Sequence, residues 1–318
     1  MRSRRGGTLA LALLFDLTLG DPPNRFHPVA WMGTLIASAK RHAPPSGNFS
    51  RFAYGAAMDV GGAAAMAAVG YLLERGIAHL PWPLDCIVEA GLLKSVFTLK
   101  GLGAAAREVE AALEADDLPE ARRLVSWHLV SRDTTTLSAS KVAAAAVESV
   151  AENTSDGVVA PLFYYCLGGL PAAFAYRFIN TADSMLGYHD PVHEWLGKVP
   201  ARLDDLVNLL PARLAAALLT LAAPLTGANA QSAWRIWQRD KSVTASPNAG
   251  HPMSAMAGAL DVELEKIGHY RLGKGGRQPV AADIGRSVKL SRMAVALGAG
   301  LALGLPLLLR VFHRRASR

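Results

Sequence analysis

Apolar residues in this 318-residue chain gather in six blocks that are separated by polar regions. The blocks are residues 8–20, 53–80, 84–103, 157–180, 206–228 and 292–312. In the last block, residues 293–309 carry no charge, a length within the range that spans a hydrocarbon core of ~30 Å. Block 84–103 carries Glu89 and Lys94, so we expect it to be amphipathic or buried.

Three polar regions separate the apolar blocks, at residues 104–152, 181–205 and 232–290. The first has the Ala/Leu periodicity of soluble helices, an acidic turn at Asp116, and Ser138 as an N-cap before "ASKVAAAAVESVAE". Strand-like alternation is nearly absent and the chain has no internal repeat. The pattern therefore predicts an all-α polytopic membrane helical bundle, a single integral membrane domain over residues 1–318 with its helical inter-span regions on the cytoplasmic side.

Composition agrees with a membrane protein, because 51% of the residues are hydrophobic, only 19% are charged and the mean hydropathy is +0.20. The net charge of +7 includes arginines clustered at both ends of the chain, which predicts cytoplasmic termini by the positive-inside rule. No basic stripe with interleaved aromatics supports nucleic-acid binding. Cys86 and Cys166 lie in apolar surroundings, so neither a disulfide framework nor a metal site is expected.

The short N-terminal apolar block imitates a signal peptide. Asp16 interrupts it and no small-x-small cleavage site precedes "DPPNRFHPV", so we expect a retained first helix.

The segment "ESVAENTSDG" at residues 148–157 places acidic and amide side chains between two apolar stretches. Glu148 and Glu152 are four residues apart, so a helix would stack them on one face. Asn153 and Asp156 follow at the expected helix end, where Gly157 fits a C-cap. The alternative is a solvated acidic helix end without a ligand.

Two further clusters contain the oxygen ligands that Mg²⁺ prefers. In "INTADSML", Asn180 and Asp183 are about one helical turn apart at the end of an apolar block, where ionisable groups are costly. In "ARLDDLVN", Arg202, Asp205 and Asn208 fall near one helical face. The alternative for Arg202 and Asp205 is an intrahelical ion pair.

Basic and turn motifs supply candidate phosphate ligands. "SRDT" contains Arg132 and Asp133, "QRD" contains Arg239, and "SPNAG" contains Asn248 in a turn that is either an anion nest or an ordinary turn. The loop "GKGGR" lacks the spacing of a phosphate-binding P-loop. These residues fit a phosphorylated substrate and Mg²⁺, but they do not define a reaction.

The order of these motifs is similar to that of a known family. "DLTLGDPPNRFHPVAWMG", "SRDTTTLS", "AAVESVAENTSDGVVAPLFYYCLGGL", "ARLDDLVNLLPARL" and "SPNAGHPMSAMAGAL" resemble the CbiB/CobD cobalamin-biosynthesis membrane proteins, adenosylcobinamide-phosphate synthases. The resemblance covers about residues 8–290 and implies an ATP-dependent ligase in the cytoplasmic (inner) membrane. It would join adenosylcobyric acid to (R)-1-amino-2-propanol phosphate, with Mg²⁺ as cofactor and ATP as co-substrate.

Within the family-like motifs, we assign expected roles by side-chain chemistry. The expected catalytic residues are Glu148, Glu152 and Asp156. The expected metal ligands are Glu152, Asp156 and Asp183. The expected substrate and phosphate ligands are Arg132, Asp133, Asn153, Asn180, Arg202, Asp205, Arg239 and Asn248.

Expected partners besides the substrates are the lipid bilayer, with homo-oligomers and other cobalamin-pathway enzymes left open. Two alternatives to a ligase also stay open, a membrane transporter and a non-catalytic scaffold of a corrinoid pathway complex. A transporter would favour inverted repeats, which the sequence lacks. A scaffold would not need its acidic residues.

Overall fold

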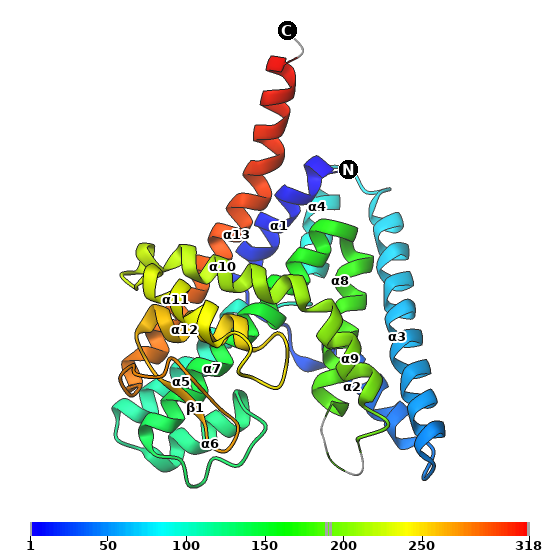
Figure 1. Ribbon diagram of the computed structural model, residues 1–318. Helices are drawn as coiled ribbons and strands as arrows, with labels where there is room; N and C mark the ends of the chain where they lie inside the picture. Colours follow the sequence, from blue (N-terminus) through cyan, green and yellow to red (C-terminus); the bar gives the residue numbers. More distant parts are fainter. Residues whose placement is uncertain (1, 188–189, 191–192, 317–318) are drawn as a thin grey trace. The chain divides into compact units, whose positions relative to one another are not determined.

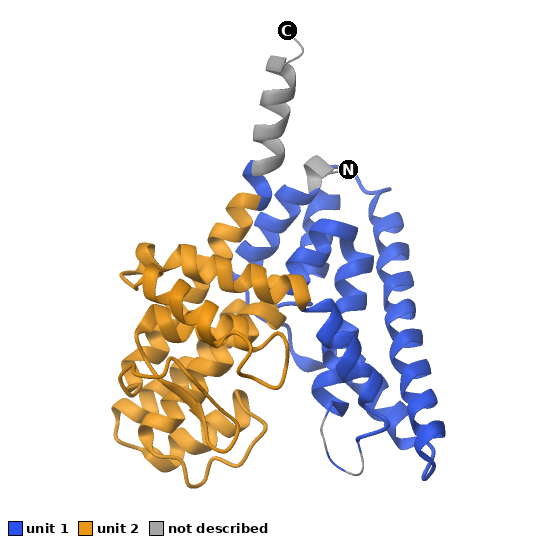
Figure 2. Cartoon of the chain, viewed as in Figure 1, with its two compact units in different colours: residues 1–98, 160–208, 302–318 blue, residues 99–159, 209–301 orange. Residues whose placement is uncertain are grey.

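The computed structural model describes residues 2–187, 190 and 193–316, with side chains described for residues 5–187, 190 and 193–304. The chain divides into two compact units, coloured separately in Figure 2. Unit 1 comprises Met1–Thr98, Ala160–Asn208 and Ala302–Arg318, and unit 2 comprises Leu99–Val159 and Leu209–Leu301. Each unit is therefore assembled from segments that are distant in sequence.

Unit 1 is built from helices. Its elements are α1 (Arg2–Thr18), the short 3₁₀ turn η1 (Asn24–Phe26), α2 (Pro28–Arg41), α3 (Asn48–Ile77), α4 (Leu84–Lys94), α8 (Ala160–Leu186) and α9 (Lys198–Val207). Helix α8 packs against α3, α2 and α9, while α1 packs against α4 (Figure 1). The buried Asp16 of α1 pairs with Lys94 of α4 at 3.2 Å, which explains how each apolar block accommodates its charge.

Helix α8 is interrupted at Gly169, and a side chain of α3 accepts a hydrogen bond from the backbone there. Gly169 has φ of 74°, in the left-handed region that glycine tolerates, and Pro171 lacks an amide proton. The amide of Leu170 instead donates to Glu74 Oε1 at 2.8 Å. The Glu74 carboxylate, although it lies in an apolar block, therefore provides the hydrogen-bond acceptor for a backbone amide that has no acceptor within the helix.

Unit 2 contains the remaining elements. They are α5 (Leu99–Glu114), α6 (Leu118–His128), α7 (Ala139–Asn153), the π-helical segment η2 (Thr154–Val159), α10 (Leu209–Thr226), α11 (Ala230–Asp240), α12 (Gly250–Leu260), strands β1 (Leu264–Lys266) and β2 (Tyr270–Leu272), and α13 (Ala281–Ala316) up to Leu301. Every residue of α12 is buried, and this helix packs against α7, α10 and α11. It forms the core of the unit, as expected for a helix that is apolar on all sides.

Two sequence expectations change in detail. Block 84–103 forms two helices, α4 and the start of α5, separated by a turn after Lys94. The polar region 232–290 contains a two-stranded antiparallel hairpin in which Leu264 pairs with Leu272 and Lys266 with Tyr270. Strands of three residues are too short to leave a recognisable alternation in the sequence.

The prediction of an all-α membrane protein is confirmed. Among the described residues, three helical stretches are long and apolar enough to cross a membrane: Asn48–Ile77, Ala139–Leu186 and Leu209–Thr226. In the first, only 11% of the most apolar window is buried within the protein. A long apolar helix with so little protein around it requires lipid as its surroundings.

Candidate functional site

The acidic segment lies where α7 changes its helical form. Ser138 caps α7, accepting from the Lys141 amide at 3.4 Å as predicted. The predicted C-cap at Gly157 is wrong, because residues 154–159 form a π-helical segment and the helix continues into α8. Since a π-turn keeps its backbone hydrogen-bonded with one extra residue per turn, no capping glycine is needed. Such π-segments occur often at functional sites.

Glu148 forms a buried ion pair with an arginine from a loop. Its side chain is 4% exposed, and Arg132 Nη2 donates to Glu148 Oε2 at 3.1 Å. A carboxylate at this depth requires such a partner, because desolvation of an isolated charge is costly. The structure thus unites two predicted site residues, from "SRDT" and "ESVAENTSDG". Arg132, which was predicted to be a phosphate ligand, here binds the carboxylate of Glu148.

A cavity of about 210 Å³ lies beside this pair. It is lined by Glu152 of α7, the loop 244–249, Met253 of α12 and three residues of the hairpin, Lys266, His269 and Tyr270. Burial and the neighbouring Glu148 and Glu152 carboxylates raise the pKa of Tyr270, so its hydroxyl stays protonated at neutral pH. The cavity therefore combines the carboxylate of Glu152, the amino group of Lys266 and the protonated hydroxyl of Tyr270.

The hairpin residues of this cavity were not predicted from the sequence. Lys266, His269 and Tyr270 lie in no family-like motif, and the short strands that carry them have no periodic signal. The hairpin is tied to α7 by an ion pair between Lys141 and Glu265. Hydrogen bonds from Lys141 and Arg271 lower the pKa of Glu265 to about 2. The ion pair holds strand β1 against the first turn of α7.

The "SPNAG" turn forms part of the same cavity. The Ser246 hydroxyl accepts from the amides of Asn248 at 3.2 Å and Ala249 at 3.4 Å. Asn248 is 4% exposed and lies two residues before the buried helix α12. Because Ser246 engages these two amides, the arrangement is that of an ordinary turn.

Arg239, a predicted phosphate ligand, is engaged by its neighbour. It donates to both oxygens of Asp240 at 2.6 and 2.8 Å, while Asp240 Oδ2 also accepts from the Gly273 amide at 2.7 Å. Despite its burial, the pKa of Asp240 is lowered by these hydrogen bonds. The group anchors the "GKGGR" loop to α11.

The remaining predicted residues of unit 2 border the acidic segment. Asn153 donates to the Ser149 carbonyl at 2.9 Å, and Asp156 lies in η2. Asp133 accepts from the amide and hydroxyl of Thr135 at 2.9 and 2.7 Å, and these bonds lower its pKa. Asp133 therefore closes the turn that presents Arg132.

His251 follows "SPNAG" and is neutral. Trp237 Nε1 donates to His251 Nδ1 at 2.9 Å, which requires the proton of the neutral ring to be on Nε2. Burial, together with Arg213 and Lys241, lowers the pKa of His251 to about 4. This histidine is a structural hydrogen-bond partner in the core of unit 2.

The other predicted residues, Asn180, Asp183, Arg202 and Asp205, belong to unit 1. Arg202 is 79% exposed and lies 3.9 Å from Asp205, an intrahelical ion pair as the alternative interpretation held. Two residues of this motif are buried, Asp204 and Asn208, and Asp204 accepts from Asn180 Nδ2 at 3.2 Å. Burial raises the pKa of Asp204 to about 6.

A second buried carboxylate accompanies Asp204 in unit 1. Asp59 of α3 is fully buried, interacts electrostatically with Asp204, and has no hydrogen-bond partner on either carboxylate oxygen among the described residues. The nearby Asn208 accepts from the Tyr176 hydroxyl at 2.9 Å. Asp59 lies in the apolar block 53–80, and a carboxylate in such a block is itself a sequence signal of a polar cluster.

The described side chains contain no group of three or more His, Cys, Asp or Glu that would hold a metal without help from a substrate. Mg²⁺ is commonly held by one or two carboxylates together with substrate phosphates. In unit 2 the donor set that fits this description is Glu152, with Glu148 behind it.

The fold and this cavity define an all-α membrane protein with a carboxylate- and lysine-lined site. A family model described as CobD/Cbib protein matches residues 9–298. The chain belongs to the CobD/Cbib family.

Similar proteins carry the same family name. The chain is 46% identical over 263 residues to cobalamin biosynthesis protein CobD of Dehalococcoides mccartyi (strain CBDB1), covering 83% of this chain and 85% of that relative. It is 37% identical over 315 residues to cobalamin biosynthesis protein CobD of Citrobacter koseri, covering 94% and 97%. No solved structure matches the chain.

Proposed function

We propose that this protein is an ATP-dependent amide ligase of cobalamin biosynthesis. It joins a carboxylate of adenosylcobyric acid to the amine of (R)-1-amino-2-propanol phosphate, giving adenosylcobinamide phosphate. Membership of the CobD/Cbib family and relatives named cobalamin biosynthesis proteins support the pathway. The side chains at the end of α7 support the chemistry.

The observation that carries the proposal is the cavity that Glu152, Lys266 and Tyr270 line together. A ligase of this type handles a cationic amine and anionic phosphates in one place. Glu152 offers a carboxylate to the ammonium group, and Lys266 offers a positive charge to a phosphate. The buried Arg132–Glu148 pair beside the cavity fixes the position of the α7 end.

The proposed reaction has two steps. A carboxylate oxygen of the corrinoid side chain attacks the γ-phosphorus of ATP, and the bond to the departing ADP oxygen breaks. The ammonium group then loses one proton to Glu152, and its nitrogen attacks the acyl carbon of the acyl phosphate. A C–N bond forms, the C–O bond to the phosphate breaks, and the second amine proton leaves with the inorganic phosphate, so one ATP is converted to ADP and phosphate for each amide.

The positive charges of the cavity act on the transferring phosphoryl group. Lys266 stabilises the charge that develops on the phosphate oxygens, and the protonated Tyr270 donates a hydrogen bond to an oxygen. A Mg²⁺ ion held by Glu152 and the substrate phosphates would supply further neutralisation of phosphate charge. Because one carboxylate cannot hold the ion and accept the amine proton at once, Glu152 would serve the ion during phosphoryl transfer and accept the proton in the second step.

The deciding experiment is an assay of the detergent-solubilised protein with ATP–Mg²⁺, adenosylcobyric acid and aminopropanol phosphate. We expect ADP and the amide product in equal amounts, each dependent on all three substrates. Folded protein that produced neither would overturn the ligase proposal. Binding of corrinoid without turnover would favour the scaffold, and corrinoid uptake into proteoliposomes without turnover would favour the transporter.

A further inference from the structure

Unit 2 contains a cavity of about 510 Å³ beside α6. Five residues of α6 and three residues of the loop that follows it, in the "SRDT" motif and next to it, line this cavity. None of them lines the cavity beside Glu152. The volume lies within the range of small-molecule sites, which is ~300–1,000 Å³.

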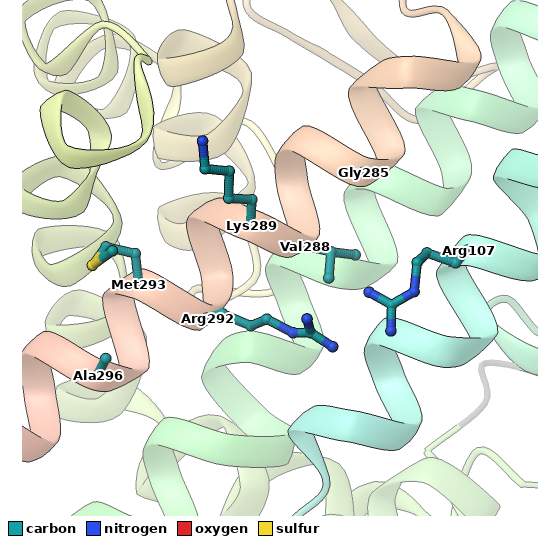
Figure 3. Close-up of a pocket in the computed structure, with 7 residues that line it drawn as sticks. All are labelled: Arg107, Gly285, Val288, Lys289, Arg292, Met293 and Ala296. Atoms are coloured by element: carbon teal, nitrogen blue, oxygen red, sulfur yellow. The ribbon is translucent and has the colours of Figure 1, made fainter. Parts of the chain in front are cut away.

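Another cavity of the unit, beside α13, does not form a comparable site. It has a volume of about 340 Å³ and contains three basic residues, but Lys289 points away from Arg107 and Arg292 (Figure 3). Arg107 also interacts electrostatically with Glu110, which accepts from the Gly285 amide at 3.1 Å. These basic groups therefore do not converge on one ligand.

Trp127 gives the α6 cavity an exposed aromatic surface. The residue is 77% exposed, although tryptophan is largely buried in most folded proteins. Leu124 and Val125, on the same helix, are buried and attach α6 to the rest of the unit. The indole ring therefore contributes little to the core, and its face is available to stack on a planar ligand.

A hydrogen-bond acceptor and a donor lie in the same cavity as the ring. Asp133 Oδ1 accepts both bonds from Thr135, at 2.9 and 2.7 Å, which leaves Oδ2 available to a donor. Arg122 donates through Nε to the Leu137 carbonyl at 2.7 Å, so its two Nη atoms are available to an acceptor. The ligand that fits these groups carries a donor and an acceptor on one edge.

The charges of the cavity argue against a simple anion site. Arg123 also lines it, but this arginine donates to both oxygens of Glu120 at 2.7 and 2.6 Å. Arg122 and Asp133 then contribute one charge of each sign. A planar ring with an amino group beside a ring nitrogen suits this balance, and adenine presents that edge.

We propose that this cavity binds the adenine base of a nucleotide. The base stacks on Trp127, its amino group donates to Asp133 Oδ2, and Arg122 donates to the adjacent ring nitrogen. Asp133 also closes the turn that presents Arg132, so the base site adjoins the arginine that binds Glu148. That the nucleotide is the ATP of the ligase rests on the proposed function, whereas the base site itself does not.

The test measures binding of ATP and of inosine triphosphate to the full chain in detergent by isothermal titration calorimetry. Inosine carries an oxygen in place of the amino group of adenine. The variants are Trp127→Ala, Trp127→Phe and Asp133→Asn, the last of which keeps a side-chain oxygen for Thr135. The control is Trp234→Ala, which removes a tryptophan that is 54% exposed on α11 and lines neither this cavity nor the one beside Glu152. Unfolding temperatures of the same samples show whether each variant is folded.

The wild type should bind ATP about tenfold more tightly than inosine triphosphate, because the inosine oxygen cannot donate to the Asp133 carboxylate. Trp127→Ala should weaken ATP binding about tenfold, whereas Trp127→Phe keeps an aromatic face and should retain most of the affinity. Asp133→Asn should remove the preference for ATP, since its amide can donate to the inosine oxygen. Trp234→Ala should bind both nucleotides as the wild type does.

The base site is overturned if the wild type binds neither nucleotide, if it binds both equally, or if Trp127→Ala binds ATP as the wild type does. Selective ATP binding without amide formation would keep the base site and overturn the ligase proposal. Amide formation with an unchanged KM for ATP in Trp127→Ala would keep the ligase and overturn the base site.

Discussion

At the scale of single residues, the carboxylates of this chain differ in what surrounds them. Glu148 is buried against Arg132, whereas Glu152, one turn later, borders the cavity. Asp204 is buried beside Asp59, whereas its neighbour Asp205 faces Arg202 at the surface. Adjacent acidic residues of one motif therefore have different roles, which substitution can separate.

Glu152→Gln should lower the turnover of the proposed ligase about 10²-fold or more, because the amide cannot accept the proton that the ammonium group loses. The measurement is formation of ADP and amide product by purified protein. Glu114→Gln provides the control, since it makes the same change at an exposed position on α5 of the same unit. Wild-type turnover by Glu152→Gln would remove this residue from the mechanism.

Asp204→Asn should raise the unfolding temperature at pH 7. Burial raises the folded-state pKa of Asp204 from 3.8 to about 6, so the folded protein holds its proton more tightly than the unfolded chain does. The stabilising effect of that proton is complete below about pH 4 and is lost as pH rises through 6. The variant should be more stable than the wild type at pH 7 and show a flatter stability profile between pH 4 and 6.

The matched control for this change is Asp205→Asn, which alters the exposed ion pair with Arg202 and should shift stability by less than about 0.5 kcal/mol. Both proteins would be unfolded in the same detergent between pH 4 and 8. If Asp204→Asn were less stable than the wild type at pH 7, the charged form of Asp204 would be the one that the fold requires.

At the scale of secondary-structure elements, the contact between α3 and α8 depends on small residues. The buried Gly70 of α3 faces the backbone of α8, and a Cβ there would lie 2.7 Å from the Pro171 nitrogen and 2.8 Å from the Leu170 carbonyl carbon. Helices embedded in lipid commonly use such residues, because close approach supplies the packing that the hydrophobic effect does not.

Gly70→Ala should therefore separate α3 from α8 and lower stability by about 1–3 kcal/mol. Gly61→Ala makes the same substitution on α3 where nothing lies within 4 Å of the new Cβ, and we expect it to be neutral or slightly stabilising. Unfolding temperatures of both variants in detergent test the difference. Equal values for the two variants would show that α3 and α8 are not in close contact at Gly70.

Much of this element organisation could be predicted from the sequence, since Ser138 caps α7 and the apolar blocks at 53–80 and 206–228 correspond to α3 and α10. The π-segment could not, because the extra residue is set by packing and leaves no pattern in residues 154–159. Which of Asp204 and Asp205 is buried also could not be predicted, because it depends on the helices that pack against α9, and periodicity does not identify them. The pairing of Arg132 with Glu148 joined two motifs that the sequence showed only separately.

At the scale of the whole molecule, the charges at the chain ends make a topological prediction. Arg2, Arg4 and Arg5 precede the first apolar block, and four further arginines follow Leu309. Because basic flanks are retained on the cytoplasmic side, both termini should be cytoplasmic and the number of spans even. Three candidate spans occur among the described residues, so an even number requires a further span or a candidate that does not cross.

Reporter fusions measure this directly. Green fluorescent protein fused to either terminus should fluoresce in the bacterial host, because it fluoresces on the cytoplasmic side of the membrane. Alkaline phosphatase fused to the C-terminus should be inactive, because it is active only on the opposite side. The control fusion follows Ala228, where the apolar block 206–228 ends, and reports whether that block crosses. An active C-terminal phosphatase with a fluorescent N-terminus would give an odd number of spans. In that case the uncharged run 293–309 would cross in the direction opposite to the one that its flanking arginines predict.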